Sequence, residues 1–99
     1  MIDEATHGLQ ASGATIFPEG LAIGSTWNLG LVKKIYSAVA KEARSTGSNH
    51  MCTLVIEPNR DPRMGRNCEG YSEDVYLCSQ IAEAIVSGAQ GGNIADQDK

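Results

Sequence analysis

The stretch that decides the fold is "MCTLVIEP", residues 51 to 58 of this 99-residue chain. Its apolar and β-branched side chains form a continuous run, without the alternation that marks a half-buried strand. Such a run is typical of a strand buried on both faces of a parallel sheet. Pro58 closes the run, because proline cannot donate a hydrogen bond to a sheet ladder. The stretch therefore predicts an interior strand of an α/β protein.

A helix is predicted before this strand, over residues 28 to 47. Asn28 can serve as its N-cap, and Gly47 can supply the left-handed residue that ends many helices. The residues expected on its apolar face recur at helical spacing: Leu31, Ile35, Ala38, Val39 and Ala43. The cationic side chains of the opposite face are interpreted as a water-facing side.

A second helix is predicted after the strand. Ser72 is expected to begin it, with Glu73 and Asp74 at the positive end of the helix dipole. Gly91 and Gly92 are expected to end it. Its predicted apolar face holds Leu77, Ile81, Ala84, Ile85 and Gly88. Helix, buried strand, long loop and helix follow one another as in the repeating unit of an α/β fold.

The first 25 residues are rich in glycine and other small residues, and they show no long periodic pattern. Two short apolar runs lie between the glycines, at Ala14–Phe17 and Leu21–Ile23. Runs this short predict brief strands or irregular loop.

The composition argues against two classes of partner. The net charge of −4 has the wrong sign for a generic nucleic-acid binder, which needs a basic surface to release counterions. No apolar stretch approaches the ~20 residues that span a bilayer, so we expect neither nucleic acid nor membrane as a partner. The opening "MIDEATHGLQ" carries acids where a secretory signal carries lysine or arginine. No signal peptide is therefore visible in this segment, and the compartment stays open.

Histidine and cysteine are present without the spacing of a metal site. The residues concerned are His7, His50, Cys52, Cys68 and Cys78. They form no CxxC or HxxxH pattern, and the glycines form neither GxGxxG nor a P-loop. We therefore expect no metal and no cofactor. The odd number of cysteines also argues against a disulfide framework.

The loop "NRDPRMGRNCEGY", residues 59 to 71, is longer than the usual strand-to-helix connection, and long loops at this place often carry function. Arg60 and Arg63 are interpreted as supports of the loop that pair with neighbouring acids. Arg66 follows Gly65, whose flexible backbone can turn the arginine toward a ligand. A planar guanidinium can bridge two oxygen atoms, such as neighbouring sugar hydroxyls. An ion pair with Glu69 is the alternative for Arg66.

Three segments together resemble glycoside hydrolase family 3, the family of β-glucosidases, β-xylosidases and related exo-acting enzymes. They are "RDPRMGRNCEGYSED", "ATIFPEGLAIGSTWN" and the "HG" before them. The resemblance runs in one register from about residue 4 to residue 91. It implies that residues 1–99 are a fragment of the family's N-terminal (β/α)8 barrel. About two β/α units of a partial TIM barrel would be present, because a complete barrel needs about 250 residues.

The resemblance also implies a function. The whole enzyme would be a retaining O-glycosyl hydrolase of carbohydrate catabolism, acting on a β-linked oligosaccharide or glycoside. Arg66 would contact the sugar in the −1 subsite, and Glu4 in "DEATHG" would accept hydrogen bonds from its hydroxyls. Met64 departs from the family, since a tryptophan is usual at that place in the loop.

The resemblance places no catalytic residue in this chain. In the family, the nucleophilic aspartate lies on a much later barrel strand, and the acid/base lies further still. Capping and helix-dipole effects explain Glu73 and Asp74 instead. The remainder of the barrel would therefore be needed for a complete site.

Two other interpretations of the sequence stay open. A non-catalytic carbohydrate-binding α/β module would bind sugar weakly without turnover. A structural protein whose arginine loop pairs with acidic partners would bind protein in a salt-sensitive way and ignore sugars. For a full-length hydrolase, a secreted or periplasmic location is compatible with the sequence.

Overall fold

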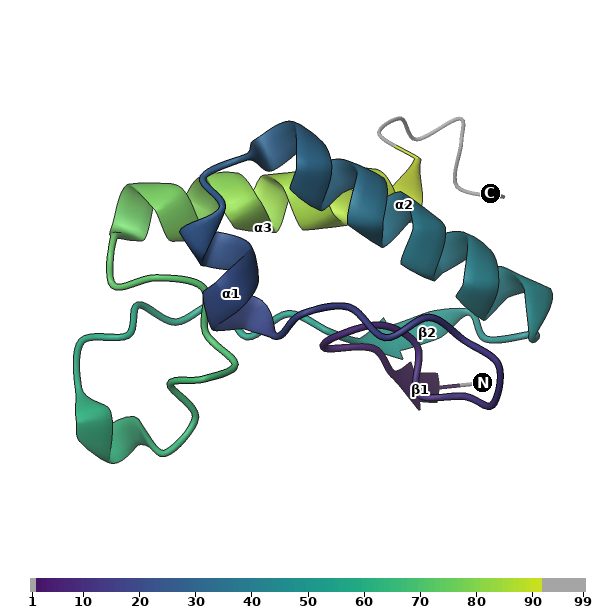
Figure 1. Cartoon of the computed structure of the whole chain (residues 1–99), viewed down its shortest axis with the longest axis horizontal. Coiled ribbons are helices and arrows are strands. Elements are labelled where there is room, and N and C mark those ends of the chain that lie inside the picture. Colours follow the sequence, from purple (N-terminus) through teal and green to yellow (C-terminus); the bar gives the residue numbers. More distant parts are fainter. Residues whose placement is uncertain (1, 92–99) are drawn as a thin grey trace.

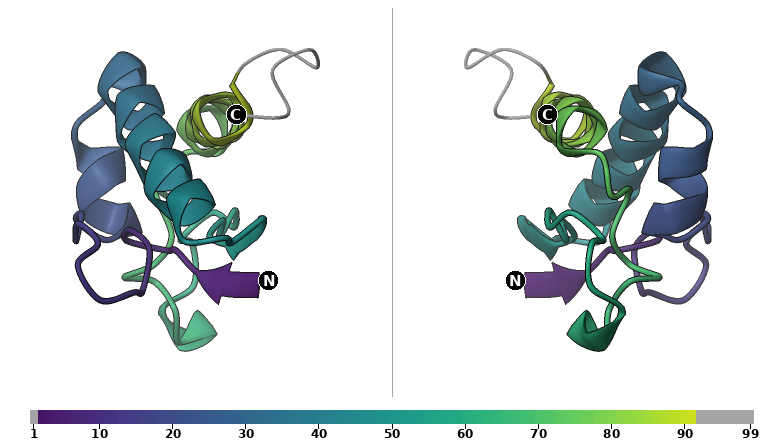
Figure 2. Two further views of the ribbon diagram at one scale, coloured as in Figure 1. Left: turned by 90° about the vertical axis from the view of Figure 1, so that its right-hand side faces the viewer. Right: turned by 90° about the vertical axis from the view of Figure 1, so that its left-hand side faces the viewer.

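The fold is described from a computed structural model, for residues 2–91 of the chain. Two parallel strands lie on one side, and the helices pack together on the other (Figures 1 and 2). The elements in chain order are β1 (Ile2–Glu4), α1 (Gly20–Ser25), α2 (Leu29–Ser45), β2 (His50–Cys52), the 3₁₀ helix η1 (Pro62–Met64) and α3 (Val75–Gln90). This is an α/β arrangement in which each strand is followed by helix.

The two strands pair in parallel, with Ile2 opposite His50 and Glu4 opposite Cys52. The Ala5 amide continues the pairing by donating to the Cys52 carbonyl at 2.9 Å. Since the strands are parallel, their carboxyl ends meet at one edge. Both arrows in Figure 1 point toward the side on which the loop with η1 lies.

The prediction of a strand in "MCTLVIEP" is right in position and wrong in extent. Only Met51 and Cys52 of this run belong to β2, and Ile56 is 49% exposed. A strand buried on both faces needs neighbours along its whole length. In the described part of the chain, β2 has one partner, and that partner is three residues long.

The N-terminal region also differs from the prediction. Ile2–Glu4 forms β1, which the sequence pattern did not indicate. Leu21–Ile23 lies in helix α1, neither strand nor loop, whereas Ala14–Phe17 belongs to no regular element, which agrees with the predicted alternative of irregular loop. Tertiary packing accounts for α1. Its Gly20 and Gly24 lie so close to the backbone of residues 69–71 that no side chain would fit there.

The helix predicted over residues 28–47 is α2. The Asn28 side chain accepts a hydrogen bond from the Leu31 amide, so the predicted N-cap is confirmed. The predicted apolar face is confirmed at Val39 and Ala43, and Ile35 packs against the core, whereas Leu31 is 42% exposed. The buried residues are Val32, Tyr36, Val39 and Ala43.

The apolar face predicted for α3 is confirmed, with Leu77, Ile81, Ile85 and Gly88 buried. The helix begins later than predicted. Asp74 is the N-cap, since its carboxylate accepts a hydrogen bond from the Tyr76 amide. The Ser72 hydroxyl accepts a hydrogen bond from the Asp74 amide, in the turn before the helix. Gly91 ends the helix in a left-handed conformation, and the predicted stop at Gly92 lies outside the described residues.

The core lies between the helices and the strand ends. Its buried members are Ala5, Ile23, Val32, Tyr36, Val39, Tyr71, Leu77, Cys78, Ile81 and Ile85. Helices α2 and α3 form the largest contact, and β1 and β2 lie beneath them (Figure 1). None of the helices within residues 2–91 has both the length and the apolarity to cross a bilayer.

Candidate functional site

The first half of the arginine loop is closed on itself around Asp61. The Asp61 carboxylate accepts from the Arg63 amide at 2.9 Å, and from Nε and Nη2 of the same arginine at 3.1 and 2.8 Å. These bonds lower the pKa of Asp61 and raise that of Arg63. They fix the turn over Pro62–Met64. The geometry therefore agrees with Arg63 as a support of the loop.

The second half of the loop orients Arg66. Gly65 has a φ of 84°, a left-handed conformation that glycine adopts without steric cost, and it reverses the chain just before Arg66. The Nε atom of Arg66 then donates to the Glu69 carboxylate. This hydrogen bond is the largest cause of a raised pKa at Arg66 and of a lowered pKa at Glu69. The pair engages Nε, so donors remain on the terminal nitrogens for a ligand.

Glu4 lies at the carboxyl end of β1, on the same edge as the arginine loop. Its charge is one of the smaller causes of the raised pKa of Arg66, after Glu69. The charge of His7 likewise contributes to the lowered pKa of Glu69, after the hydrogen bond from Arg66. The two residues predicted to hold sugar, Glu4 and Arg66, are therefore brought within electrostatic reach of each other.

This edge of the molecule is open. The Arg66 side chain is 61% exposed, while the Glu69 side chain is 29% exposed. The guanidinium is thus oriented by Glu69 without being enclosed by residues 2–91. An open position suits a group that contacts a ligand or further protein, and it is too exposed for the ion pair to contribute much to stability.

Two buried tyrosines support the strand ends behind this edge. The Tyr36 hydroxyl donates to the Thr6 carbonyl at 3.0 Å, and it lies within hydrogen-bonding reach of the Tyr71 hydroxyl. Because the Tyr36 hydroxyl already donates to Thr6, a bond between the two tyrosines would take its hydrogen from Tyr71. Tyr71 is bonded in turn to the Val55 backbone. The resulting chain of hydrogen bonds connects α2 with residues just beyond both strands.

The same network includes Thr53. Its hydroxyl donates to the Ala5 carbonyl at 2.8 Å and lies within hydrogen-bonding reach of Tyr36. Ala5 directly follows Glu4, so the position of the Glu4 backbone depends on buried groups. Burial is the main cause of the raised pKa of both Tyr36 and Tyr71.

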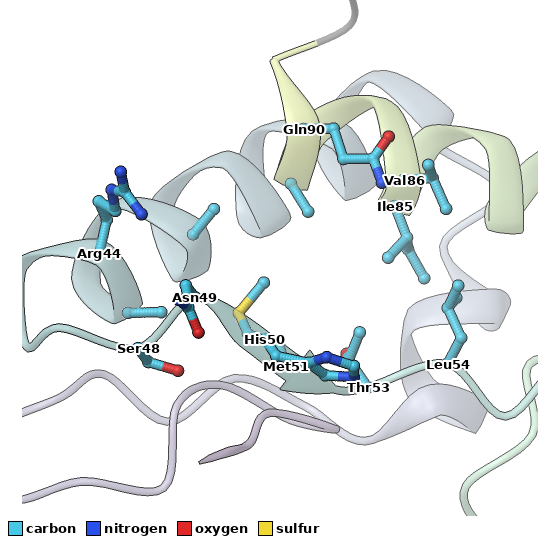
Figure 3. A pocket seen from close by; sticks show the side chains of 13 residues that line it. Arg44, Ser48, Asn49, His50, Met51, Thr53, Leu54, Ile85, Val86 and Gln90 are labelled. Carbon is cyan, nitrogen blue, oxygen red and sulfur yellow. The ribbon is translucent and has the colours of Figure 1, made fainter. Parts of the chain in front are cut away.

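Another hollow lies between the C-terminal parts of α2 and α3 and beside β2 (Figure 3). Its volume is about 450 Å³. It is lined by Ala40, Ala43, Arg44, Ser48, Asn49, His50, Met51, Thr53, Leu54, Ile85, Val86, Ala89 and Gln90. No carboxylate is among these residues, and glycoside hydrolysis depends on carboxylates. We therefore place the candidate site at the other end of the strands, around Arg66.

Arg66 and Glu4 were predicted from the sequence, whereas the residues that hold them in place were not. Glu69 was considered only as the alternative to ligand binding, whereas the structure gives Arg66 this partner and leaves further donors exposed. Tyr36 could have been found from its spacing, since Val32, Tyr36, Val39 and Ala43 follow a helical period. No local pattern marks Tyr71, whose partners are distant in sequence.

Parallel strands followed by helices, with a polar loop at the strands' carboxyl ends, define an α/β protein built from β/α units. The chain belongs to glycosyl hydrolase family 3: residues 2–99 match the N-terminal domain of that family. The resemblance inferred from the loop motifs is thereby confirmed.

Named relatives and solved structures agree with this assignment. The periplasmic β-glucosidase of Salmonella typhimurium is 39% identical over 84% of this chain and 11% of its own length. A β-xylosidase of Formosa agariphila is 38% identical over 89% of the chain and 13% of its own length.

Among solved structures, a β-glucosidase from Erythrobacter marinus superposes with a TM-score of 0.89 at 40% identity, over 96% of this chain and 12% of that one. A family 3 β-glucosidase from Bifidobacterium adolescentis superposes with a TM-score of 0.86 at 34% identity. This match covers 92% of this chain and 14% of that one. The chain therefore spans only about an eighth of the proteins that it matches.

Proposed function

We propose that the chain is part of an exo-acting O-glycosyl hydrolase that cleaves terminal β-linked glucosyl or xylosyl residues with retention of configuration. The observation that carries the proposal is the placement of Glu4 and Arg66 on one edge of the parallel strands, in a chain of this family. The relatives named as β-glucosidase and β-xylosidase support the substrate class, which is a β-linked oligosaccharide or glycoside.

In this proposal, Arg66 and Glu4 form part of the −1 sugar subsite. The terminal nitrogens of Arg66 donate to sugar hydroxyls, and the Glu4 carboxylate accepts from them. Glu69 holds Arg66 in place through Nε. A guanidinium that is already oriented loses less conformational entropy when the sugar arrives.

The proposal assigns no catalytic residue to this chain. A retaining glycosidase needs two carboxyl groups about 5 Å apart, one as nucleophile and one as acid/base. Glu69 is engaged by Arg66, and Asp74 caps α3, so both have roles of their own. The catalytic pair is therefore sought outside the chain, in the rest of a (β/α)8 barrel. Residues 1–99 would be a fragment of that barrel domain with two of its β/α units.

The Salmonella relative is named as a periplasmic enzyme. A periplasmic or secreted location for the full-length protein is compatible with this name. Cell fractionation of the full-length gene product tests it directly.

The proposed function is tested with the full-length gene product and nitrophenyl β-glucoside or β-xyloside. We expect turnover of at least one of these substrates. Arg66→Ala should lower kcat/KM by about tenfold or more, because charge-assisted hydrogen bonds to the sugar are lost. Arg63→Ala is the matched control from the same loop, and its kcat/KM should stay within about twofold of the parent enzyme. Unchanged kinetics of Arg66→Ala would remove this residue from the site.

A further inference from the structure

Trp27 has an unusual backbone conformation. Its φ is 50°, and within residues 2–91 it is the only residue besides glycine with a positive φ. A bulky residue in the left-handed region is strained, and such strain often lies at functional sites. Hydrogen bonds on both sides hold this turn between α1 and α2: the Trp27 amide donates to Gly24, and the Asn28 amide donates to the Thr26 hydroxyl. The direction of the Trp27 Cα–Cβ bond is therefore set by a constrained backbone.

The indole is 66% exposed and borders a hollow of about 350 Å³. One wall comes from α1, and the other from the segment that enters α3. The lining residues are Leu21, Gly24, Ser25, Trp27, Asn59, Tyr71, Ser72, Glu73 and Leu77. Arg66 and Glu4 are not among them, so this hollow is separate from the proposed −1 subsite.

The walls of the hollow are held rigidly. A Cβ atom at Gly24 would lie 1.8 Å from the Tyr71 carbonyl oxygen, which means that α1 rests directly on the backbone of the opposite wall. The Asn59 amide donates to the Ser72 carbonyl at 2.9 Å and fixes a further part of that wall. The hollow is thus formed by packed backbone and does not depend on the position of mobile side chains alone.

The chemistry of the lining is mixed in a way that suits a sugar ring. An exposed indole presents a flat apolar face with a polar N–H. Glu73 adds an exposed carboxylate, which can accept from two neighbouring hydroxyls, and neither ion pair found among the described residues involves it. Ser25 and Ser72 add hydroxyl groups. The volume lies at the lower end of the range for small-molecule sites.

We propose that this hollow is an accessory site for one pyranose ring of a β-linked glucosyl or xylosyl chain. The C–H face of the ring would stack on Trp27, and its hydroxyls would donate to Glu73. The choice of ligand rests on the proposed glycosidase function, whereas the site itself is distinct from Arg66. It would hold the oligosaccharide outside the −1 subsite.

Trp27 is the single tryptophan of the chain, so its fluorescence reports on this site alone. Titration of the 99-residue chain with cellobiose or xylobiose should give a saturable change in Trp27 emission, half-complete on the order of 1 mM. Sorbitol, which has hydroxyls and no ring, should give no saturable change. Absence of a saturable sugar response in chain that is helical by circular dichroism overturns the proposal, as does an equal response to sorbitol.

Variants separate this site from the −1 subsite. Glu73→Ala should weaken the Trp27 response about tenfold, while Glu83→Ala, which removes an exposed carboxylate of α3 that does not line the hollow, should not change it. Arg66→Ala should leave it unchanged too. Loss of the response in Arg66→Ala would assign the signal to the −1 subsite and overturn a separate site. A saturable response of the 99-residue chain, together with no hydrolysis by the full-length protein, would instead count against the proposed function alone.

A last variant distinguishes binding from a structural role of Trp27. Trp27→Gly relieves the left-handed strain, so its melting temperature should equal or exceed that of the parent. In the full-length protein with Arg66→Ala, calorimetry should detect cellobiose binding that Trp27→Gly abolishes. A clear fall in melting temperature, or binding that survives Trp27→Gly, would show that the indole is a packing residue and overturn the proposal.

Discussion

Gly88 in α3 lies directly against the backbone of Lys33 in α2. A Cβ atom at position 88 would stand 2.5 Å from the Lys33 carbonyl oxygen, closer than two such atoms can approach. One turn further along α2, the Ser37 hydroxyl donates to the Gly88 carbonyl at 3.1 Å. The two helices therefore touch through their backbones, and this contact sets where α3 lies above the strands.

Gly88→Ala should destabilise the chain by about 1–3 kcal/mol, since the added methyl group meets backbone that cannot move aside. Gly30→Ala is the control on α2. A Cβ there has only the Asn28 Oδ1 atom nearby, at 3.6 Å, so the better helix former should gain up to about 1 kcal/mol. Urea unfolding followed by circular dichroism measures both. Equal stability of the two variants would contradict the close helix contact.

Gly88 was expected on the apolar face of α3 from spacing alone, and this part of the fold was predictable because helical periodicity is a local signal. The apolar face of α2 was less predictable from spacing. Leu31 is apolar and yet exposed at the start of α2, whereas Tyr36 is buried because its hydroxyl finds partners inside. A local pattern of hydrophobicity gives no information about a hydrogen-bond partner that lies 30 residues away in the sequence.

The length of the strands and the contacts of the candidate site also depend on residues that are distant in the sequence. "MCTLVIEP" predicts a buried strand, but the length of β2 depends on its neighbour β1, which no pattern within the run encodes. Arg66 and Glu4 came from motif resemblance. Their placement at one edge depends on the parallel register of the strands, and the ion pair with Glu69 depends on the turn at Gly65.

The tyrosine network gives a second prediction. Tyr36→Phe leaves the part-buried Thr6 carbonyl without its donor, which should cost about 1–3 kcal/mol of stability. Tyr71→Phe should cost a similar amount, and the double variant less than the sum, because the two hydroxyls share a bond. Tyr76→Phe is the control: its ring is 70% exposed, so the change should stay within about 0.5 kcal/mol. Additive losses in the double variant would contradict a shared hydrogen bond.

The same tyrosines predict sensitivity to alkali. Burial raises the pKa of Tyr36 and Tyr71 above the ordinary value of 10.0. The folded state then holds its phenol protons more tightly than the unfolded state does. The corresponding stability is fully present below pH 10 and falls as pH rises above it. Melting temperatures between pH 8 and pH 11 measure this, and the decline should be smaller in Tyr71→Phe. A decline of equal slope in that variant would assign the effect to other groups.

The ion pair of Arg66 and Glu69 predicts an effect at acid pH. The hydrogen bond from Arg66 holds the pKa of Glu69 below its ordinary value of 4.5. A depressed pKa means that the pair is complete above pH 4.5 and is lost as pH falls through the lower, native value. A titration of the Glu69 carboxyl carbon by NMR should therefore have its midpoint below 4.5, and Arg66→Ala should move the midpoint upward.

Arg63→Ala is the control for this titration. It should leave the Glu69 midpoint in place and raise that of Asp61, whose pKa is lowered mainly by its hydrogen bonds from Arg63. The two variants thereby separate the halves of the loop. If Glu69 instead titrates above 4.5 in the native chain, or follows Arg63 and not Arg66, then Glu69 does not orient the guanidinium. The proposed −1 subsite would then lose its physical basis, because a freely rotating arginine has no fixed donors to offer a sugar.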